Sequence, residues 1–226
     1  MKNILCIIPI RSNSKGLKHK NIIKFNKKPL IVNTAKCAIR SKIFKDIVIA
    51  YDSENYKKII TKYINHESLN FFKRSIKSSS ANSPTEIIIN EVIEKFSNYD
   101  LVYLMQTTSQ FTKPIDLISS LKNFKHKKLD SMFSAYSTKK FFWIKKKNFC
   151  SPVNYNYKKR PMRQKNNNYI CENGAFYIFK KKGFVKHRNR MFGKIGYFEF
   201  PEYRSIEIDN INDFKVAKSF LKINFS

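Results

Sequence analysis

The stretch NILCIIPIRSNSKGLKHKNI, residues 3–22, passes from a nearly continuous apolar run into a cluster of cations. A short apolar run of this kind is typical of a β-strand that is buried on both faces, as in a parallel sheet. The residues after it include Arg11, Lys15 and Lys20 and no acid. The stretch therefore predicts a buried strand that leads directly into a positively charged loop.

Strand-like and helix-like segments alternate over roughly the first half of the chain. Apolar runs predict further buried strands at 46–53 and 99–110, and helical spacing predicts helices at 29–42, 54–64, 85–96 and 114–124. Three successive β-then-α units predict a parallel sheet with right-handed crossovers. We therefore expect an α/β fold, a mostly parallel twisted sheet flanked by helices in a Rossmann-like arrangement. In such sheets ligands bind outside the carboxyl ends of the strands.

The pattern changes after about residue 130. Two segments rich in aromatic and basic residues lack helical periodicity, and they predict a hairpin or arm that projects from the sheet. Extended segments and a closing amphipathic helix follow, at 168–180, 197–209 and 210–223. We expect a single domain, 1–226, with the projecting β arm at about 137–168.

The net charge is +29 for 226 residues, with 37 lysines against 8 arginines spread along the chain. Base-reading surfaces more often use Arg, so an anionic small molecule is favoured over nucleic acid as the partner. A basic nucleic-acid-binding module that uses Phe141, Trp143 and Tyr157 is the alternative. No stretch reaches the about 20 apolar residues of a membrane span, and no signal-peptide pattern is present. We expect a cytoplasmic protein without a membrane partner.

The loop after the first strand has the composition of an anion-binding site. Ser12, Ser14 and Gly16 keep it small, so that backbone N–H groups can turn toward one point, and Arg11, Lys15 and Lys20 add charge. Polyphosphate is the natural ligand of such a loop. The Walker pattern GxxxxGK[ST] and the dinucleotide pattern GxGxxG are both absent. The alternative is a solvated basic loop.

Two acids near the C-terminus form a second candidate site. Glu207 and Asp209 lie two residues apart on a segment expected to be extended, so their side chains share a face. Mg²⁺ is commonly held by one or two carboxylates, with phosphate oxygens and waters as its other ligands. The alternative is that Asp209 only caps the helix that follows.

Two weaker patterns lie between these sites. QTTSQ, 106–110, places amide and hydroxyl groups at a strand end, where they suit a base edge or sugar hydroxyls. In RPMRQ, Arg160, Arg163 and Gln164 have the groups to clamp a carboxylate or phosphate. In ENGAFYIF, Gly174 lets a ligand or another backbone approach the strand. A basic loop and a core strand are the alternative readings.

Four motifs, taken in order, resemble the acylneuraminate cytidylyltransferases, the enzymes that make CMP-sialic acid. IPIRSNSKGLKHKN is similar to their opening IPARxGSKGxxxKN, and LMQTTSQF to LQPTSPLR. RPMRQ with ENGAFYIF resembles RPRRQ with ENGAxY, and IEIDNINDF resembles xDIDTxxDL. The motifs span residues 4 to 214, nearly the whole chain. The related enzymes for Kdo, an eight-carbon keto sugar acid, lack SKG in this loop and fit less well.

The resemblance implies a homodimeric nucleotidyltransferase in which an arm of one subunit reaches over the active site of the other. CTP and a nonulosonic acid, a nine-carbon α-keto sugar acid, would give the CMP-sugar and pyrophosphate with Mg²⁺, or Mn²⁺ in its place. The metal ligands implied are Glu207 and Asp209, and the catalytic residues are Arg11, Lys15, Lys20 and Asp209. Nucleotide contacts fall to Arg11, Ser12, Ser14, Lys15, Gly16, Lys20, Asn21 and Ser83. Substrate contacts fall to Gln106, Thr108, Ser109, Lys145, Arg163, Gln164, Asn173, Gly174 and Ala175.

The chain departs from the family pattern at several of these positions. Glu207 stands where the family usually has Asp, and it is one methylene longer. Asn82 and Ser83 occupy the segment where the family carries an Asp, and the Arg that follows the family's PTSPL is missing, with Lys113 as its nearest substitute. The departures leave open which sugar acid is used. A Kdo-type or other sugar nucleotidyltransferase is the alternative within the same enzyme class.

Overall fold

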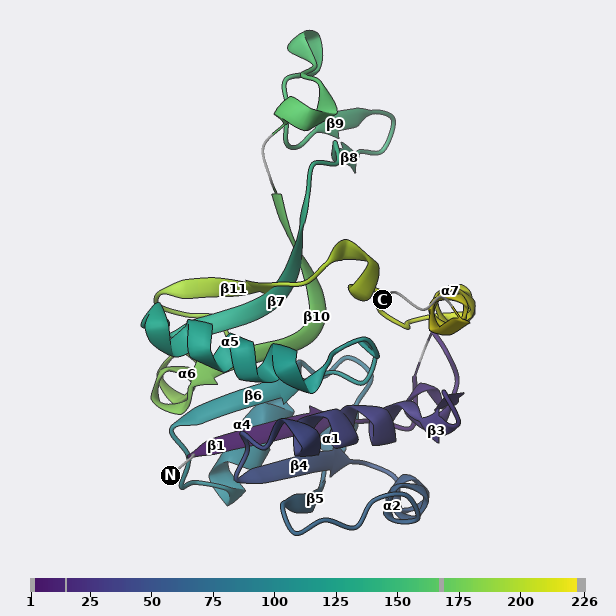
Figure 1. The fold of residues 1–226 in the computed structure, drawn as a ribbon, viewed down its shortest axis with the longest axis vertical. Helices are drawn as coiled ribbons and strands as arrows, with labels where there is room; N and C mark the ends of the chain where they lie inside the picture. The colour runs from purple at the N-terminus through teal and green to yellow at the C-terminus, as the bar shows by residue number, and fades with distance from the viewer. Residues whose placement is uncertain (1–2, 15, 167–168, 223–226) are drawn as a thin grey trace.

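The chain builds a seven-stranded sheet (Figure 1). The computed structural model describes residues 3–14, 16–166 and 169–222. In sheet order the strands are β11 (Ile195–Glu199), β7 (Ser131–Thr138), β10 (Tyr169–Lys180), β6 (Leu101–Met105), β1 (Ile4–Pro9), β4 (Asp46–Tyr51) and β5 (Leu69–Lys73). Neighbours pair in parallel except for β10, which runs antiparallel to β6 and β7. The predicted α/β fold with a mostly parallel sheet is confirmed.

Helices cover both faces of this sheet (Figure 1). On one face α1 (Leu30–Ser41) and α5 (Pro114–His126) pack over a cluster that includes Cys6 and Ile8 of β1. On the other face α4 (Thr85–Lys95) and α6 (Lys181–His187) pack over a cluster that includes Leu5 and Ile7. Successive residues of β1 thus enter opposite cores, and all four are fully buried. This two-sided burial explains why the strand reads as a continuous apolar run.

A third, smaller core joins the two ends of the chain. The short hairpin of β2 (Lys24–Phe25) and β3 (Lys28–Pro29) contributes Phe25, and the C-terminal helix α7 (Ile211–Lys222) contributes Phe214 and Ala217. Ile208, from the segment before α7, is fully buried in the same cluster. The segment that carries Glu207 and Asp209 is therefore fixed next to the loop that follows β1.

The segment between β7 and β10 extends well beyond the sheet (Figure 1). It contains the antiparallel pair β8 (Trp143–Lys145) and β9 (Cys150–Pro152), followed by two 3₁₀ turns at Tyr157–Lys159 and Arg163–Lys165. Its expected role in dimerisation stays a prediction. Among the residues described, no helix has the length and apolar character needed to cross a membrane.

Several elements differ from the expectation. The edge strand β5, the single-turn helix α3 (Ile76–Ser79), the β2–β3 hairpin and α6 were not predicted. The segment expected to be extended over 197–209 is divided, because β11 ends at Glu199 and a 3₁₀ turn follows at Glu202–Arg204. Glu207 and Asp209 therefore lie in an irregular segment and not in a strand. α2 (Glu54–Thr61), by contrast, begins at the expected residue.

Candidate active site

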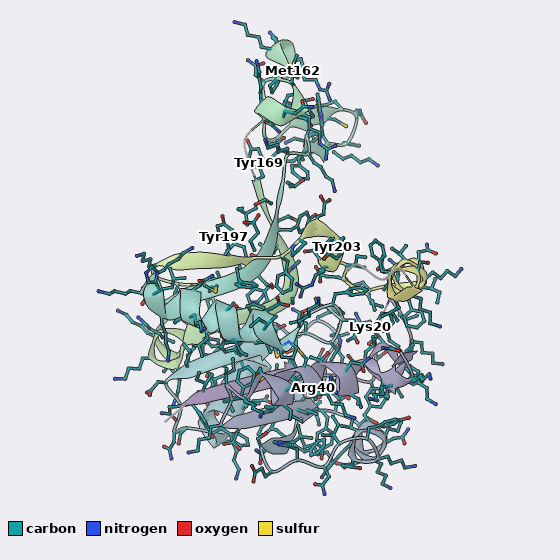
Figure 2. All side chains as sticks on the ribbon, viewed as in Figure 1. Lys20, Arg40, Met162, Tyr169, Tyr197 and Tyr203 are labelled. Carbon is teal, nitrogen blue, oxygen red and sulfur yellow. The ribbon has the colours of Figure 1, made fainter. Side chains whose placement is uncertain are left out.

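A cleft of about 430 Å³ lies at the carboxyl ends of β1 and β6, where the parallel sheet predicts a ligand site. The loop after β1 lines it with Arg11, Ser14, Gly16, Lys20 and Asn21. The end of β6 adds Gln106, Thr107 and Thr108, and Asp209 faces them. The stretch between β5 and α4 adds Arg74, Ala81 and Ser83, and the first turns of α4 add Thr85 and Ile88. Figure 2 labels Lys20 near α7, far from Met162 on the projecting arm.

The cationic loop is held in place by specific hydrogen bonds. Arg11 Nη1 donates to the carbonyl oxygen of Ala81 at 3.0 Å, which spans the cleft from the loop to the opposite wall. Ser12 does not line the cleft, because its N–H and hydroxyl both donate to the carboxylate of Asp52. Lys15 lies outside the described residues. The loop therefore directs Arg11 and Lys20 to the cleft and uses Ser12 as an anchor.

Asn21 links the loop to the neighbouring strand. It is buried, its Nδ2 donates to the Arg11 carbonyl at 2.8 Å, and its Oδ1 accepts from the Thr107 hydroxyl at 2.5 Å. Both polar atoms of the amide are thus used within the protein. Although Asn21 lines the cleft, its side chain holds β1 and β6 in register at the site.

Ile208, between Glu207 and Asp209, is buried in the third core, so the two carboxylates flank a residue that anchors this segment. The backbone N–H of Ile208 donates to the carbonyl oxygen of Thr108 at 3.0 Å, which fixes the segment against the end of β6. Burial, followed by the nearby charge of Asp209, raises the pKa of Glu207 above its usual value. Asp209 Oδ1 pairs with Lys20 Nζ at 2.7 Å. The two acids thus lie beside the cationic loop.

The alternative role of Asp209 as a helix cap is wrong. Asn210 caps α7, because its Oδ1 accepts from the N–H groups of Asn212 and Asp213. Asp213 completes the arrangement, since its Oδ2 accepts from the N–H groups of Asp209 and Asn210. The Asp209 carboxylate is therefore left for the cleft.

These two carboxylates fit a hard divalent cation. Among the described residues the Glu207 carboxylate has no hydrogen bond or ion pair of its own, although it is half-buried. Gly174 leaves room beside it, since a Cβ there would come within 2.7 Å of Glu207 Oε2. No cluster of three or more acidic, His or Cys ligands occurs in the described ranges. Phosphate oxygens and water would complete the shell, which suits Mg²⁺.

The residues expected to contact the substrate divide into two groups. Gln106 and Thr108 line the cleft. Ser109 and Asn173 are buried and brace it, because the Ser109 hydroxyl donates to the Asn173 carbonyl and Asn173 Nδ2 donates to the Ser205 hydroxyl.

The irregular part of β10 passes close behind Gln106 and Glu207. The pairing of β10 with β7 shifts between Glu172 and Tyr177, and Gly174 within that interval has a φ of 60°. This left-handed backbone favours glycine, and the missing side chain lets Glu207 approach. Ala175 is buried, and its carbonyl accepts from the N–H of Gln106. Gly174 and Ala175 therefore shape this wall by their backbone.

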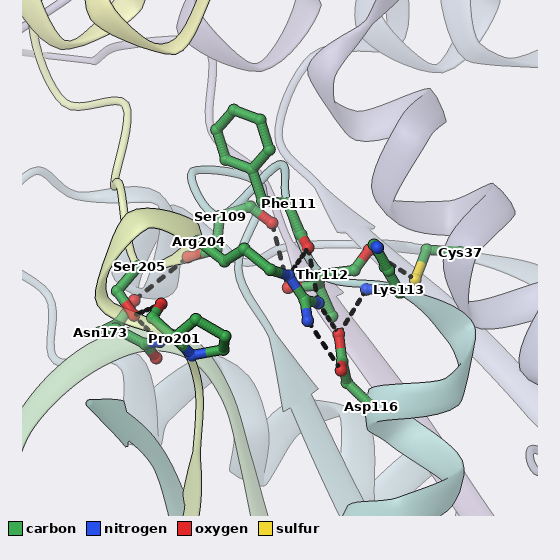
Figure 3. Close-up of polar contacts among 10 residues, drawn as sticks. All are labelled: Cys37, Ser109, Phe111, Thr112, Lys113, Asp116, Asn173, Pro201, Arg204 and Ser205. Atoms are coloured by element: carbon green, nitrogen blue, oxygen red, sulfur yellow. Dashed lines mark hydrogen bonds and ion pairs between the residues drawn. The ribbon is translucent and has the colours of Figure 1, made fainter. Parts of the chain in front are cut away.

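Arg204 ties the acidic segment to the loop after β6 (Figure 3). Its guanidinium donates to the Phe111 carbonyl from Nε at 3.1 Å and from Nη2 at 2.9 Å, and it also pairs with the carboxylate of Asp116. Asp116 in turn accepts from the N–H of Lys113, at the start of α5. Both partners of the ion pair are largely buried. Arg204 therefore fixes the position from which the chain runs on to Glu207.

Three buried polar atoms of the cleft lack a partner in the protein. They are Arg74 Nε, Ser83 Oγ and Thr108 Oγ1, and they make up three of the four such atoms found in the described residues. Because buried polar atoms are normally hydrogen-bonded, unsatisfied atoms grouped in one cleft indicate a site shaped for a polar ligand.

Arg74 was missed by sequence reasoning. Burial lowers its pKa, and its Nη1 donates to the Ile10 carbonyl at 3.1 Å. The available signal was an arginine two residues after the pair of Phe71 and Phe72 in a chain that otherwise prefers lysine. Thr107 was missed as well, although its neighbours in QTTSQ were named.

Three predicted substrate contacts are not brought to this cleft within one chain. Lys145, Arg163 and Gln164 lie on the exposed arm and do not line the cleft. The expected clamp also differs, since the Arg160 guanidinium stacks 4.4 Å from the ring centroid of Phe141. Within one chain, the described residues that assemble the site come from the loops after β1 and β6, from the stretch between Arg74 and Ile88, and from the segment before α7.

Comparisons with known proteins identify the family. A sequence profile described as Cytidylyltransferase matches residues 5–223. N-acylneuraminate cytidylyltransferase A of Danio rerio is 31% identical over 222 residues, which cover 96% of this chain and 50% of that protein. Pseudaminic acid cytidylyltransferase of Campylobacter jejuni is 27% identical over 231 residues, 99% of this chain and 98% of that protein. The chain thus spans about half of the first relative and nearly all of the second.

A solved structure with the same fold is a CMP:2-keto-3-deoxy-manno-octonic acid synthetase complexed with CTP. Its TM-score is 0.71 at 14% sequence identity, and the match covers 97% of this chain and 98% of that one. At this identity the likeness concerns the fold alone.

Proposed function

The chain belongs to the cytidylyltransferase family, and from this premise we propose that it transfers CMP from CTP to the C2 hydroxyl of a nonulosonic acid. The hydroxyl oxygen forms a bond to the α-phosphorus, the bond from that phosphorus to the bridging oxygen breaks, and pyrophosphate leaves with the electron pair. The hydroxyl proton passes to the medium. The product is a CMP-sugar of the sialic, legionaminic or pseudaminic acid type.

The observation that carries this proposal is the placement of cations and acids across one cleft. Arg11, Lys20 and Arg74 line it, and Asp209 faces them with Glu207 beside it. A triphosphate needs cations along its oxygens, and a divalent metal that shares those oxygens needs carboxylates at one end. The three cations and Asp209 line one cleft of about 430 Å³, and Glu207 lies beside it, which supports the proposal.

The protein contributes mainly by positioning and by charge. Arg11 and Lys20 would offset the charge that builds on the leaving pyrophosphate. Glu207 and Asp209 would hold Mg²⁺, which when bound neutralises phosphate charge and favours loss of the hydroxyl proton. Gln106 and the Thr108 hydroxyl, which line the cleft, would bind hydroxyl or amide groups of the incoming substrate. Alignment of the two reactants would supply much of the remaining acceleration.

The arm supports a homodimer as the functional form. Its apolar side chains are exposed in the single chain, among them Trp143 at 46%, Phe149 at 65% and Met162 at 68%. Residues 139–165 contain basic residues and no acid. In a dimer, Lys145 and Arg163 would reach the other subunit's cleft, where the substrate's carboxylate offers a partner. The test is to mix an Arg163→Ala chain with an Asp209→Ala chain, since activity above that of either variant alone requires a site built from two chains.

The proposed activity is tested by pyrophosphate release with each of the four nucleoside triphosphates against sialic, legionaminic and pseudaminic acids and Kdo. We expect turnover with CTP and one nonulosonic acid. Turnover with Kdo alone would show that the protein has the Kdo-type activity instead. A folded protein that turns over none of the pairs contradicts the proposed activity.

A further inference from the structure

Asp52 lies at the end of β4, behind the cationic loop, and it neither lines the cleft nor matches a motif of the sequence analysis. We infer that Asp52 is a positioning residue that holds the loop in the shape that binds the triphosphate. The inference rests on the proposed function, since it concerns how the same site takes its nucleotide.

The contacts of Asp52 converge on a single residue of the loop. The N–H of Ser12 donates to both carboxylate oxygens, at 2.9 Å and 3.0 Å, and the Ser12 hydroxyl donates to Oδ2 at 3.1 Å. Hydrogen bonds to a charged acceptor are about twice as strong as neutral ones. Because Ser12 follows Arg11 directly, fixing its backbone also fixes the point from which the Arg11 side chain leaves the loop.

A second brace comes from α2. The hydroxyl of Tyr56 donates to the Ser12 carbonyl at 3.3 Å, and it lies 3.0 Å from Nδ1 of His19. The N–H, hydroxyl and carbonyl of Ser12 are therefore all engaged by residues at the end of β4 and in α2. His19 has a left-handed backbone, with a φ of 55°, immediately before the turn that carries Lys20. The loop is thus held at both ends.

The charge of Asp52 also acts on Arg74, the second arginine of the cleft. Burial is the main cause that lowers the pKa of Arg74; the charge of Asp52 raises this pKa, and the charge of Arg11 lowers it. The carboxylate therefore offsets the repulsion between two cations that must remain close together before any ligand is bound. The same negative charge repels an incoming triphosphate, so charge alone would make Asp52 unfavourable for nucleotide binding.

Positioning by Asp52 should favour CTP binding and its charge should oppose CTP binding. The direction in which CTP affinity changes when Asp52 is replaced therefore shows which effect is larger. CTP binding is measured by isothermal titration calorimetry on the full chain, for the unaltered protein and for Asp52→Ala, Asp52→Asn and Asp46→Ala. Asp46 is the matched control, because it begins β4, the strand that Asp52 follows, and it accepts from Asn70 and Tyr99 at the sheet end away from the cleft. Circular dichroism and the melting temperature report whether each variant is folded.

We expect Asp52→Ala to weaken CTP binding about tenfold, although it removes a negative charge near the site. Asp52→Asn is also uncharged but keeps one acceptor for the Ser12 N–H, so it should bind CTP more tightly than Asp52→Ala. Asp46→Ala should lose stability and keep its CTP affinity. In turnover assays, Asp52→Ala should raise the KM for CTP by a larger factor than the KM for the sugar acid.

Unchanged or tighter CTP binding by Asp52→Ala overturns the inference, because Asp52 would then act on CTP binding only through the repulsion between its charge and the triphosphate. Equal losses in Asp46→Ala and Asp52→Ala overturn it too, because the role would be general stability. If Asp52→Ala does not fold, the Asp52→Asn variant decides. Weaker CTP binding by Asp52→Asn, with the same affinity for the sugar acid as the unaltered protein, supports the inference. Unchanged CTP binding by Asp52→Asn rejects the inference. Failure of the unaltered protein to bind CTP would instead contradict the proposed function itself.

Discussion

Lys20 Nζ lies 2.7 Å from Asp209 Oδ1, so a cation proposed for the phosphates and a carboxylate proposed for the metal pair with each other across the cleft. The lysine side chain is 17% exposed and the aspartate 61%. A bound metal would compete with the Lys20 ammonium for Asp209, and a triphosphate would compete with Asp209 for Lys20. The two ligands should therefore help each other to bind.

Lys20→Met is expected to raise the affinity for Mn²⁺ in the absence of nucleotide, because Asp209 loses its competing cation. The gain should be about two- to fivefold, the range of a partly exposed ion pair. Free Mn²⁺ is measured by electron paramagnetic resonance. Arg11→Met is the control, since it removes the same charge from the cleft but has no ion pair with Asp209. Equal gains in both variants would show a general charge effect without competition.

Arg11→Ala and Asp209→Ala are each expected to lower kcat/KM for CTP at least ~100-fold, the scale of losing one group that stabilises charge in a transition state. Pyrophosphate release measures the rate. Lys18→Ala is the control, since Lys18 is an exposed cation of the same loop that does not line the cleft. Near-normal turnover by either variant would show that the replaced residue is not catalytic.

Much of the fold was predictable because buried elements have recognisable patterns of apolar residues in the sequence. β1 and β6 are buried on both faces and therefore read as apolar runs. β5 was missed because it is a half-buried edge strand of five residues, too short and too mixed to show a period. α6 was missed because its seven residues include three lysines and one glycine that mask the buried Phe184.

The candidate site was predictable only where charge types cluster along the sequence. Arg11, Lys20 and Asp209 stand out because they belong to such clusters. Arg74 does not, since its role depends on β5 lying next to β4, a tertiary relationship that no local spacing encodes. The same limit applies to Asn210, whose capping of α7 depends on the irregular path of the preceding segment.

Glu207→Gln is expected to stabilise the protein at neutral pH while it abolishes Mn²⁺ binding. Because burial raises the pKa of Glu207, the native state keeps this proton at pH values at which the unfolded chain has released it. Ionisation therefore costs stability as the pH rises through the raised pKa. The gain in stability of Glu207→Gln over the unaltered protein should disappear below about pH 4, where Glu207 is protonated in both the folded and the unfolded state.

Thermal melts at several pH values test this prediction, since each kcal/mol corresponds to about 2–4 °C at this chain length. Glu67→Gln, at an exposed position, serves as the control and should change the free energy of unfolding by less than about 0.5 kcal/mol. A lower melting temperature for Glu207→Gln at pH 7 would contradict the account of Glu207 as a buried carboxylate kept for metal binding.

Arg204→Ala is expected to destabilise the protein by about 3 kcal/mol, because it leaves the Asp116 carboxylate buried without its cation. Urea unfolding gives the free energy. Lys140→Ala is the control, since it breaks an ion pair with Glu202 whose partners are both half-exposed, and such pairs contribute about 0–1 kcal/mol. Similar losses in the two variants would mean that the Arg204 contacts shown in Figure 3 do not hold the acidic segment.

Gly16→Ala is expected to lower both stability and activity. A Cβ at this position would lie 2.4 Å from the backbone oxygen of Asp209, and a backbone atom cannot move aside as a flexible side chain can. Either the cationic loop or the acidic segment must therefore shift, at a cost of about 1–3 kcal/mol, and the distance between Lys20 and Asp209 would change with it. Ser14→Ala in the same loop adds no atom and serves as the control for stability. A Gly16→Ala protein with unchanged melting temperature and unchanged KM for CTP would show that the loop and the acids are not in contact in solution.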